Sequence, residues 1–310
     1  MHRFVPRLSG LIRDFEPTHI VTAMPDVSLL TLVARWRASS SACIVQGVHL
    51  TQARVAHPEG FRGWLRNKFE RAMGRFAYRL VDAAVAVSEG IRKELIEEFG
   101  VADERAVLIY NPIVQDEHIA GCRTGSDITA QKTRFVAIGR LSRQKGFDIL
   151  IRALSKVDGD WRLDIYGGGE EHDALAALVG SNQLGSRVFL RGHTDDPYSV
   201  LDEADWMIMP SRFEGFGVVL VEAMARGVPS IASDCPHGPC EILDNGRFGV
   251  LVRPDHVDEL AGALGDALGG RYEFDSDLLR SRAKHFLVSL SVDKWVKMLA
   301  SLNGANKDYV

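Results

Sequence analysis

Short runs of valine, isoleucine and other apolar residues alternate with amphipathic stretches along almost the whole of this chain. A parallel β-strand is buried on both faces and reads as an apolar run, whereas a covering helix repeats its apolar residues every three or four positions. The alternation therefore predicts repeated βα units in parallel sheets. At 310 residues the chain is long enough for two α/β domains.

A polar, glycine-containing stretch at 115–133 separates two groups of predicted strands, and we interpret it as an interdomain linker or a long loop. Four strands are predicted before it, at 19–23, 42–46, 83–87 and 106–109. Six are predicted after it, at 135–138, 162–166, 188–190, 206–209, 229–232 and 249–252. Helical spacing recurs at 255–268 and 292–302.

Six strands complete a doubly wound sheet, whereas four do not. We therefore predict an α/β protein with two Rossmann-like domains facing across a cleft. Residues 1–112 would form a partial N-terminal domain and residues 113–290 a full C-terminal domain. Residues 291–310 would form a C-terminal helix that packs back toward the N-terminal domain.

Charge and cysteine content argue against several classes of protein. The formal net charge is −4, which does not favour nucleic-acid binding. The N-terminus lacks the apolar core of a signal peptide, and no run approaches the ~20 apolar residues that span a bilayer. The four cysteines form no C-x-x-C pair and have no histidine at zinc-finger spacing. We predict a cytoplasmic protein with free thiols.

The segment 211–243 combines acidic residues, glycines and a helix start. Its loop Glu214-Gly-Phe-Gly217 follows the strand at 206–209 and is therefore expected at the carboxyl edge of the sheet, where open α/β sheets bind ligands. The two glycines let the backbone approach a ligand and present amide donors. A helix that starts near Val218 would point its positive end at the same place, which favours an anion.

A less specific interpretation of the same residues stays open. Ser211 and Glu214 also fit a capping box, and Glu222 also fits an ordinary surface glutamate.

A second strand end carries two cations. Residues 135–146 form a strand, a tight turn and a helix start that bear Arg140 and Lys145. A guanidinium fork and a lysine point charge together suit a diphosphate. As isolated residues they would more often be solvated surface charges, but a second glycine-rich strand end facing the same cleft favours a phosphate site.

Three motifs together resemble those of the family-4 glycosyltransferases, also called glycosyl transferases group 1, which are retaining enzymes of the GT-B fold. They are R-L-S-R-Q-K-G at 140–146, Y-G-G-G at 166–169 and S-R-F-E-G-F-G-V-V-L-V-E-A-M-A-R-G-V-P at 211–229. The E-x7-E spacing from Glu214 to Glu222 matches the family. The resemblance extends over nearly all of the chain.

The resemblance implies a role for each matching residue. Arg140 and Lys145 would bind the donor diphosphate and neutralise the charge that grows as it leaves. Glu214 would hold the hydroxyl groups of the donor sugar, together with the backbone of Gly215, Phe216 and Gly217. Glu222 would accept hydrogen bonds from the ribose hydroxyls.

Two further positions follow from the resemblance. Gly192 and His193 fall where the family has its base-contacting loop. His49 follows a strand where family members carry a histidine that faces the sugar and phosphate, although a lone histidine after a strand is more often structural. With His49, the catalytic set implied is Glu214, Arg140 and Lys145.

The implied chemistry needs no cofactor beyond a nucleotide-diphosphate sugar of the UDP or GDP type as co-substrate. Preorganised positive charge stabilises the leaving diphosphate, so no metal is required. The D-x-D at 158–160 precedes a strand and is interpreted as a turn. The enzyme would transfer a hexose or N-acetylhexosamine, with retention, to a glycan or a lipid-linked acceptor in polysaccharide assembly.

The chain departs from the family at its N-terminus. Family members open with a strand and a glycine-rich loop, whereas this chain begins at the helix before the family's fourth strand. The strand at 19–23 would then be an exposed apolar edge. A fragment, a misassigned start and a shortened homologue are the three hypotheses.

Residues 61–80 predict an amphipathic helix with a basic side. Its apolar side consists of Phe61, Trp64, Leu65, Phe69, Met73, Phe76 and Leu80. Its basic side consists of Arg62, Arg66, Lys68, Arg71, Arg75 and Arg79. Two interpretations stay open: a helix that lies on an anionic membrane at the inner face of the cell, and a sheet-covering helix with a solvated basic face.

Two other functions compete with transfer. A catalytically silent nucleotide-sugar-binding protein would result if the short N-terminal half removed activity. A GT-B sugar-nucleotide epimerase is the second alternative, against which the combination of E-G-F-G with E-x7-E argues.

Overall fold

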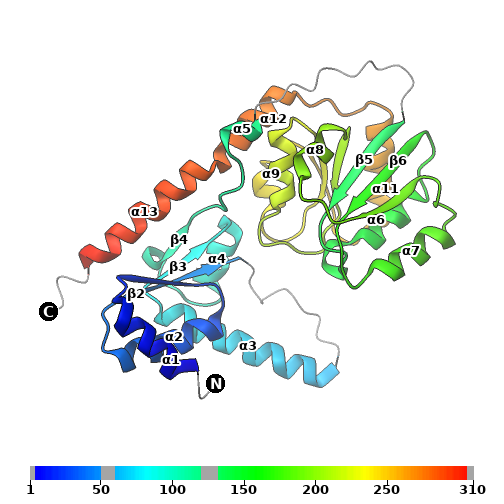
Figure 1. The fold of residues 1–310 in the computed structure, drawn as a ribbon. Helices are drawn as coiled ribbons and strands as arrows, with labels where there is room; N and C mark the ends of the chain where they lie inside the picture. The colour runs from blue at the N-terminus through cyan, green and yellow to red at the C-terminus, as the bar shows by residue number, and fades with distance from the viewer. Residues whose placement is uncertain (1–3, 50–59, 120–131, 306–310) are drawn as a thin grey trace. The chain divides into compact units, whose positions relative to one another are not determined.

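The computed structural model describes residues 4–49, 60–119 and 132–305, and the chain divides into two compact units (Figure 1). Unit 1 contains the residues up to Asn111 together with those from Ser291 onward. Unit 2 runs from Pro112 to Leu290. Each unit has its own parallel sheet.

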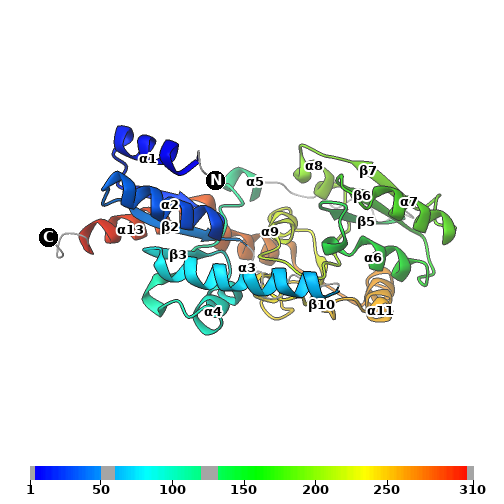
Figure 2. The ribbon, with the colours of Figure 1, turned by 90° about the horizontal axis from the view of Figure 1, so that it is seen from below.

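Unit 1 has a four-stranded parallel sheet in the order β1-β2-β3-β4. Its strands are β1 (His19–Thr22), β2 (Cys43–Val48), β3 (Ala83–Ala86) and β4 (Ala106–Leu108). Its helices are α1 (Phe4–Phe15), α2 (Pro25–Ala38), α3 (Gly60–Leu80) and α4 (Glu89–Glu97), followed by the 3-10 turn η1 (Asp103–Arg105). Helix α1 packs along α2 (Figures 1 and 2).

The burial pattern explains the order of these strands. Every residue of β2 and β3 is buried, as central strands require, whereas Val21 of β1 is 58% exposed. The exposed apolar edge that the sequence predicts is therefore confirmed. Helix α13 (Val288–Ala305) brings Met298 against Val45 and Ile109, so the end of the chain contributes to this unit's core.

Unit 2 has six parallel strands in the order β10-β9-β8-β5-β6-β7. The strands are β5 (Thr133–Ile138), β6 (Trp161–Tyr166), β7 (Val188–Gly192), β8 (Trp206–Met209), β9 (Ser230–Ser233) and β10 (Val250–Val252). The order reverses between β5 and β8, which makes a topological switch point at their carboxyl ends. The predicted doubly wound α/β fold is confirmed.

Helices cover both faces of this sheet. The helices of unit 2 are α5 (Asp116–Ile119), α6 (Phe147–Leu154), α7 (His172–Ser181), α8 (Pro197–Asp202), α9 (Val218–Ala225), α10 (Pro239–Ile242), α11 (Val257–Leu268) and α12 (Ser276–Ala283). The unit also has the 3-10 turns η2 (Arg143–Lys145) and η3 (Lys284–Phe286). Helices α6, α7 and α11 pack on the face that buries Phe135, Trp161 and Leu163, and α8 and α9 lie on the other (Figure 1). Packed between these helices, the sheet supports the loops at its carboxyl edge.

The stretch at 115–133 differs from the predicted linker at both of its ends. Asp116–Ile119 form helix α5, and Thr133 already belongs to β5. Helix α5 is held by unit 2, since the His118 ring stacks on Tyr198 at 4.2 Å and the His118 carbonyl accepts a hydrogen bond from Arg226. The polar composition of this segment does not predict such tertiary contacts. Residues 120–131 lie outside the described part.

Candidate functional site

An ion pair joins two of the predicted site residues at the switch point of unit 2. Lys145 Nζ lies 2.6 Å from Glu214 Oε1, and the hydroxyl of Ser211 donates to the same oxygen at 2.7 Å. The Glu214 side chain is only 8% exposed, and that of Lys145 is 22% exposed. A buried carboxylate with two donors has a fixed orientation.

Close backbone contacts bring the η2 turn to the end of β8. A Cβ at Gly146, where φ is +66°, would lie 2.1 Å from the Pro210 carbonyl oxygen, so only glycine fits there. The Arg212 amide donates to the Gln144 carbonyl at 2.8 Å, and the Gln144 side chain donates to the Phe213 carbonyl at 3.0 Å. These contacts set the position from which Lys145 reaches Glu214.

A second glycine holds the E-G-F-G loop from behind. At Gly238 φ is +106°, and a Cβ would lie 1.7 Å from the Phe216 carbonyl oxygen. The Glu214 amide also donates to the Pro236 carbonyl at 3.4 Å. The loop between β9 and α10 thus supports the loop that carries Glu214.

Helix α9 begins at Val218, as the sequence predicts, and its N-cap is Gly217 in the left-handed region. The cap makes no side-chain hydrogen bond to the first turn. The capping-box interpretation is wrong, because Ser211 bonds the Glu214 carboxylate instead of capping the helix. A helix start without a side-chain cap presents amide donors and positive potential.

Glu222 lies on α9 with a half-buried side chain and not on the open surface. Burial raises the pKa of its carboxyl group. Within the described residues, the Glu222 carboxylate makes neither a hydrogen bond nor an ion pair. Burial and then the charge of Glu222 raise the pKa of Tyr198 to about 12. The Glu222 carboxylate is therefore available to accept hydrogen bonds from a ligand.

The remaining cation of the site is at the surface. The Arg140 side chain is exposed and has no hydrogen-bond or ion-pair partner in the described part of the chain. The loop that carries Arg140 packs closely against Gly167, where a Cβ would lie 1.8 Å from the Gly139 carbonyl oxygen. Gly169 is required for the same steric reason, since a Cβ there would lie 2.3 Å from the Leu141 carbonyl oxygen, whereas a Cβ at Gly168 would meet no atom within 4 Å.

Gly192 and His193 follow β7. Gly192 has φ of +75°, and its carbonyl accepts a hydrogen bond from the Gly167 amide at 2.7 Å. The His193 side chain is 81% exposed and lies 3.2 Å from Asp195. The loop is therefore tied to the glycine-rich turn, while its histidine is open to solvent.

His49 belongs to unit 1, where it follows β2 with an exposed side chain. Its approach to a donor bound in unit 2 stays a prediction.

The D-x-D at 158–160 is a bend before β6, with φ of +114° at Gly159 and Asp160 paired to Lys132 at 3.2 Å. Among the residues that the structure describes, no three His, Cys, Asp or Glu side chains gather where they could hold a metal ion.

For three contributors to the site, the sequence does not predict the contacts that they make. Gln144, Ser211 and Gly238 act through tertiary contacts. Cys235 is a fourth residue nearby, and burial followed by the charge of Glu214 raises the pKa of its thiol to about 12. The glycine of the loop before Cys240, Gly238, is the nearest hint that the sequence offers.

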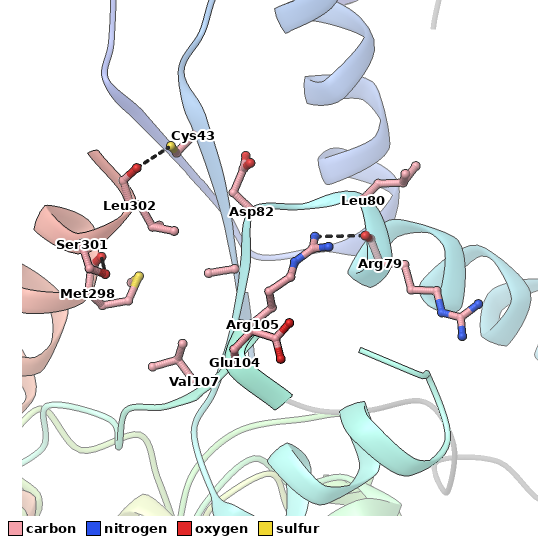
Figure 3. A pocket seen from close by; sticks show the side chains of 11 residues that line it. Cys43, Arg79, Leu80, Asp82, Glu104, Arg105, Val107, Met298, Ser301 and Leu302 are labelled. Atoms are coloured by element: carbon pink, nitrogen blue, oxygen red, sulfur yellow. Dashed lines mark hydrogen bonds between the residues drawn. The ribbon is translucent and has the colours of Figure 1, made fainter. Parts of the chain in front are cut away.

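Unit 1 contains a cavity of about 680 Å³ at the amino ends of its strands (Figure 3). Two of the charged groups that line it have partners inside the protein. Asp82 accepts from Arg35 at 2.9 Å and from the Ile44 amide at 2.7 Å, and Arg105 donates to the Arg79 carbonyl at 3.0 Å. Because ligands of such folds bind at the opposite edge of the sheet, we assign this cavity no part in the site.

Two family descriptions match the chain. "Glycosyltransferase Family 4" matches residues 1–117, and "Glycosyl transferases group 1" matches residues 132–269. The chain belongs to the family-4, group 1 glycosyltransferases, which confirms the resemblance seen in the motifs.

Curated relatives that this chain resembles include two bacterial glycosyltransferases. An N-acetylgalactosaminyltransferase of Campylobacter jejuni that acts on a diphospho-undecaprenol-linked sugar is 28% identical over 205 residues, or 65% of this chain and 56% of its own length. The lipopolysaccharide 1,6-galactosyltransferase of Salmonella typhimurium is 27% identical over 66% of this chain and 57% of its own length. The chain thus spans somewhat more than half the length of these relatives.

Solved structures share the fold over 96% of the chain. The lipopolysaccharide outer core galactosyltransferase WaaB in its apo form has a TM-score of 0.77 at 23% identity and is covered over 79% of its length. HepE of Anabaena with UDP and glucose has a TM-score of 0.79 at 21% identity, with 81% of its length covered. The two-domain GT-B fold is therefore shared with these proteins.

Proposed function

We propose that this protein is a retaining glycosyltransferase that moves a hexose or N-acetylhexosamine from a UDP- or GDP-type donor to a glycan or lipid-linked acceptor without a metal ion. The observation that carries the proposal is the pairing of Lys145 with the buried carboxylate of Glu214 at the switch point of unit 2. It sets a cation and a carboxylate side by side where α/β sheets bind ligands.

The surrounding groups suit the parts of a nucleotide sugar. Arg140 supplies an open guanidinium for the diphosphate, and the start of α9 after Gly217 supplies amide donors. The Glu222 carboxylate suits ribose hydroxyls, and Glu214 with its loop suits the hydroxyls of the sugar. The relatives' names supply the acceptor classes, since they include an undecaprenol-linked sugar and lipopolysaccharide.

The proposed mechanism is electrostatic. As the bond between the anomeric carbon and the diphosphate breaks, negative charge grows on the leaving oxygen, and Arg140 and Lys145 stabilise it. The acceptor hydroxyl attacks from the side of the leaving group, and the donor phosphate takes its proton, which retains the anomeric configuration. His49 would act on the sugar from unit 1.

A calorimetric panel of UDP- and GDP-sugars tests this proposal. We expect Arg140→Met and Lys145→Met each to weaken binding of the accepted donor about tenfold or more, since a charge-assisted hydrogen bond contributes roughly 1.5–3 kcal/mol. The control is Arg143→Met, an exposed cation in the same turn as Lys145, which should retain affinity. Unchanged affinity in both test variants would remove the phosphate site.

The same panel separates the two function classes. A transferase should hydrolyse or transfer the bound sugar, whereas a silent binding protein should release it intact. Donor binding with no turnover toward any acceptor would favour the binding protein.

We also propose that α3 is the surface that binds an anionic membrane. Four of its apolar side chains are exposed: Leu65 at 47%, Phe69 at 68%, Phe76 at 60% and Leu80 at 43%. At 100° per residue these four fall within one narrow stripe. The side chains of Phe61 and Trp64 lie outside the described set.

The residues that α3 does bury support this assignment. Among the residues of α3 whose burial is described, Gly74, Ala77 and Tyr78 are buried, with Tyr78 packed edge-on against Phe99 at 5.1 Å. A sheet-covering helix would bury its large apolar residues, whereas this one exposes them beside Lys68 and Arg75. Apolar side chains flanked by basic ones suit the interface of an anionic bilayer. None of the helices described is long and apolar enough to cross a membrane.

Sedimentation with phosphatidylglycerol vesicles tests the membrane surface. The double variant Phe69→Ser/Phe76→Ser should lose most of its vesicle binding, and Lys68→Glu/Arg75→Glu should lose binding in a salt-dependent way. Leu278→Ser, at a 55% exposed position on α12, is the control and should bind like the unaltered protein. Equal binding by all four proteins would contradict the assignment.

A further inference from the structure

A buried carboxylate in unit 2 joins three arginines from three neighbouring strands. Asp164 on β6 has a side chain with no exposed area. Its oxygens lie 2.6 Å from Arg191 Nε on β7, 2.9 Å from Arg162 Nε on β6 and 3.3 Å from Arg134 Nε on β5. Nothing in the proposed transfer mechanism uses this cluster.

Arg191 is held on a second side by an aromatic ring. The Phe189 ring contacts both Arg162 and Arg191, whose guanidinium carbons are 4.6 and 4.7 Å from its centroid. A guanidinium that contacts both a carboxylate and a ring face keeps one orientation. Arg191 comes directly before Gly192, at the irregular end of β7.

The contacts continue from Arg191 to the loops of the donor site. The Gly192 carbonyl accepts from the Gly167 amide at 2.7 Å. The Gly168 carbonyl in turn accepts from the Leu141 amide at 2.9 Å, directly after Arg140. Three loops at the ends of β5, β6 and β7 are therefore linked in series, and Asp164 is the charged group beneath them.

β7 depends on this anchor more than its neighbours do. It is the edge strand of the sheet and pairs only with β6, and the register of that pair shifts between Ile165 and Tyr166. β6 is paired on both sides, so its position does not need Arg162. Removing one member of a buried ion pair is costly, and here the weakly held strand end would move.

We propose that Asp164, acting through Arg191, is a positioning residue for the nucleotide part of the donor. It fixes the irregular end of β7, and with it the Gly192–His193 loop and the seat of the Arg140 loop. This inference rests on the proposed function for the identity of the ligand. Its structural part concerns the unliganded protein.

Two measurements on the full chain test it. In Arg191→Met, hydrogen exchange of the Gly167 amide should speed up about tenfold or more without any ligand, because its acceptor on Gly192 is released. The KM for the donor should rise about tenfold while kcat stays within about twofold, since the reacting groups are untouched. Asp164→Asn should show the same pattern, and Arg191→Lys should restore part of the affinity.

Arg162→Met is the matched control, because it removes a guanidinium from the same carboxylate on a strand held from both sides. It should leave Gly167 exchange and donor KM within about twofold of the unaltered protein. Equal effects of Arg162→Met and Arg191→Met on exchange would overturn the inference and leave a general stabilising cluster. An unaltered protein that binds no nucleotide would instead overturn the proposed function, and the exchange result would still decide whether Arg191 anchors these loops.

Discussion

Glu214 and Glu222 lie eight residues apart, and their surroundings give them different properties. The Glu214 carboxylate is buried against Lys145 and Ser211. Glu222 is half-buried without such donors, and burial raises the pKa of its carboxyl above the ordinary value of 4.5. Because folding raises this pKa, the folded protein is less stable once the carboxyl group ionises. The free energy of unfolding therefore falls as the pH rises through the folded-state pKa.

At the residue scale we expect Glu222→Gln to stabilise the free protein at pH 7 and to weaken nucleotide binding. The melting temperature should rise by roughly 2 °C, because the buried charge is removed. The difference should vanish below the ordinary pKa of 4.5, where the glutamate is protonated in both states. Glu273→Gln, at an exposed position, should change neither property. Thermal melts across pH check both.

Gly238 gives a second prediction at this scale. Gly238→Ala should destabilise unit 2 by more than about 3 kcal/mol, because the new methyl group would meet the Phe216 carbonyl in a left-handed backbone conformation. Gly246→Ala has a similar φ of +91° but meets no atom closer than 3.6 Å, so its cost should stay near about 1 kcal/mol. Denaturant unfolding separates the clash from the backbone strain, and equal costs would contradict the predicted contact.

At the scale of elements, α13 completes the core of unit 1. Met298 packs with Val45 and Ile109, with Trp295 and Leu299 beside it. The helix is anchored at its beginning, where Ser291 donates to the Tyr110 carbonyl at 2.8 Å. Strands β2 to β4 thus owe part of their cover to a helix far later in the chain.

We therefore expect Met298→Ala to destabilise unit 1 by about 2–3 kcal/mol through the cavity that it leaves. Val296→Ala lies on the same helix at a 60% exposed position and should be nearly neutral. A comparison of the two variants by denaturant unfolding checks the packing of α13. A neutral Met298→Ala would mean that the helix does not cover this sheet in solution.

At the scale of the whole molecule, two units with separate cores should unfold in two resolvable steps. The Met298→Ala substitution should lower the midpoint temperature of the unfolding step that belongs to unit 1. A nucleotide at about a hundred times its Kd should stabilise unit 2 by about 2.7 kcal/mol and raise the other step by roughly 5–10 °C. Calorimetry with UDP and GDP identifies the donor's nucleotide, and a shift in neither step would argue against the donor site.

Much of this architecture could be predicted from local patterns. All ten predicted strands are present with ends within two residues, because fully buried parallel strands read as apolar runs. The start of α9 was predictable from the glycine-containing loop before it, and the exposed edge at β1 from the resemblance to the family. Helix α5 was not, since its stability comes from the ring of Tyr198 and the guanidinium of Arg226 and not from its own four residues.

The amino-acid sequence by itself determined the two βα-rich halves, the family and the residue types at the strand ends, because periodicity and motif spacing are properties of neighbouring residues. Only the tertiary structure decided that Lys145 pairs with Glu214, that Ser211 orients that carboxylate instead of capping a helix, and that Asp164 joins three strands. These contacts connect residues brought together by the order of the strands, which no local pattern encodes. Burial strengthens the electrostatic interactions of these charged groups, because it removes the water that would otherwise compete for them.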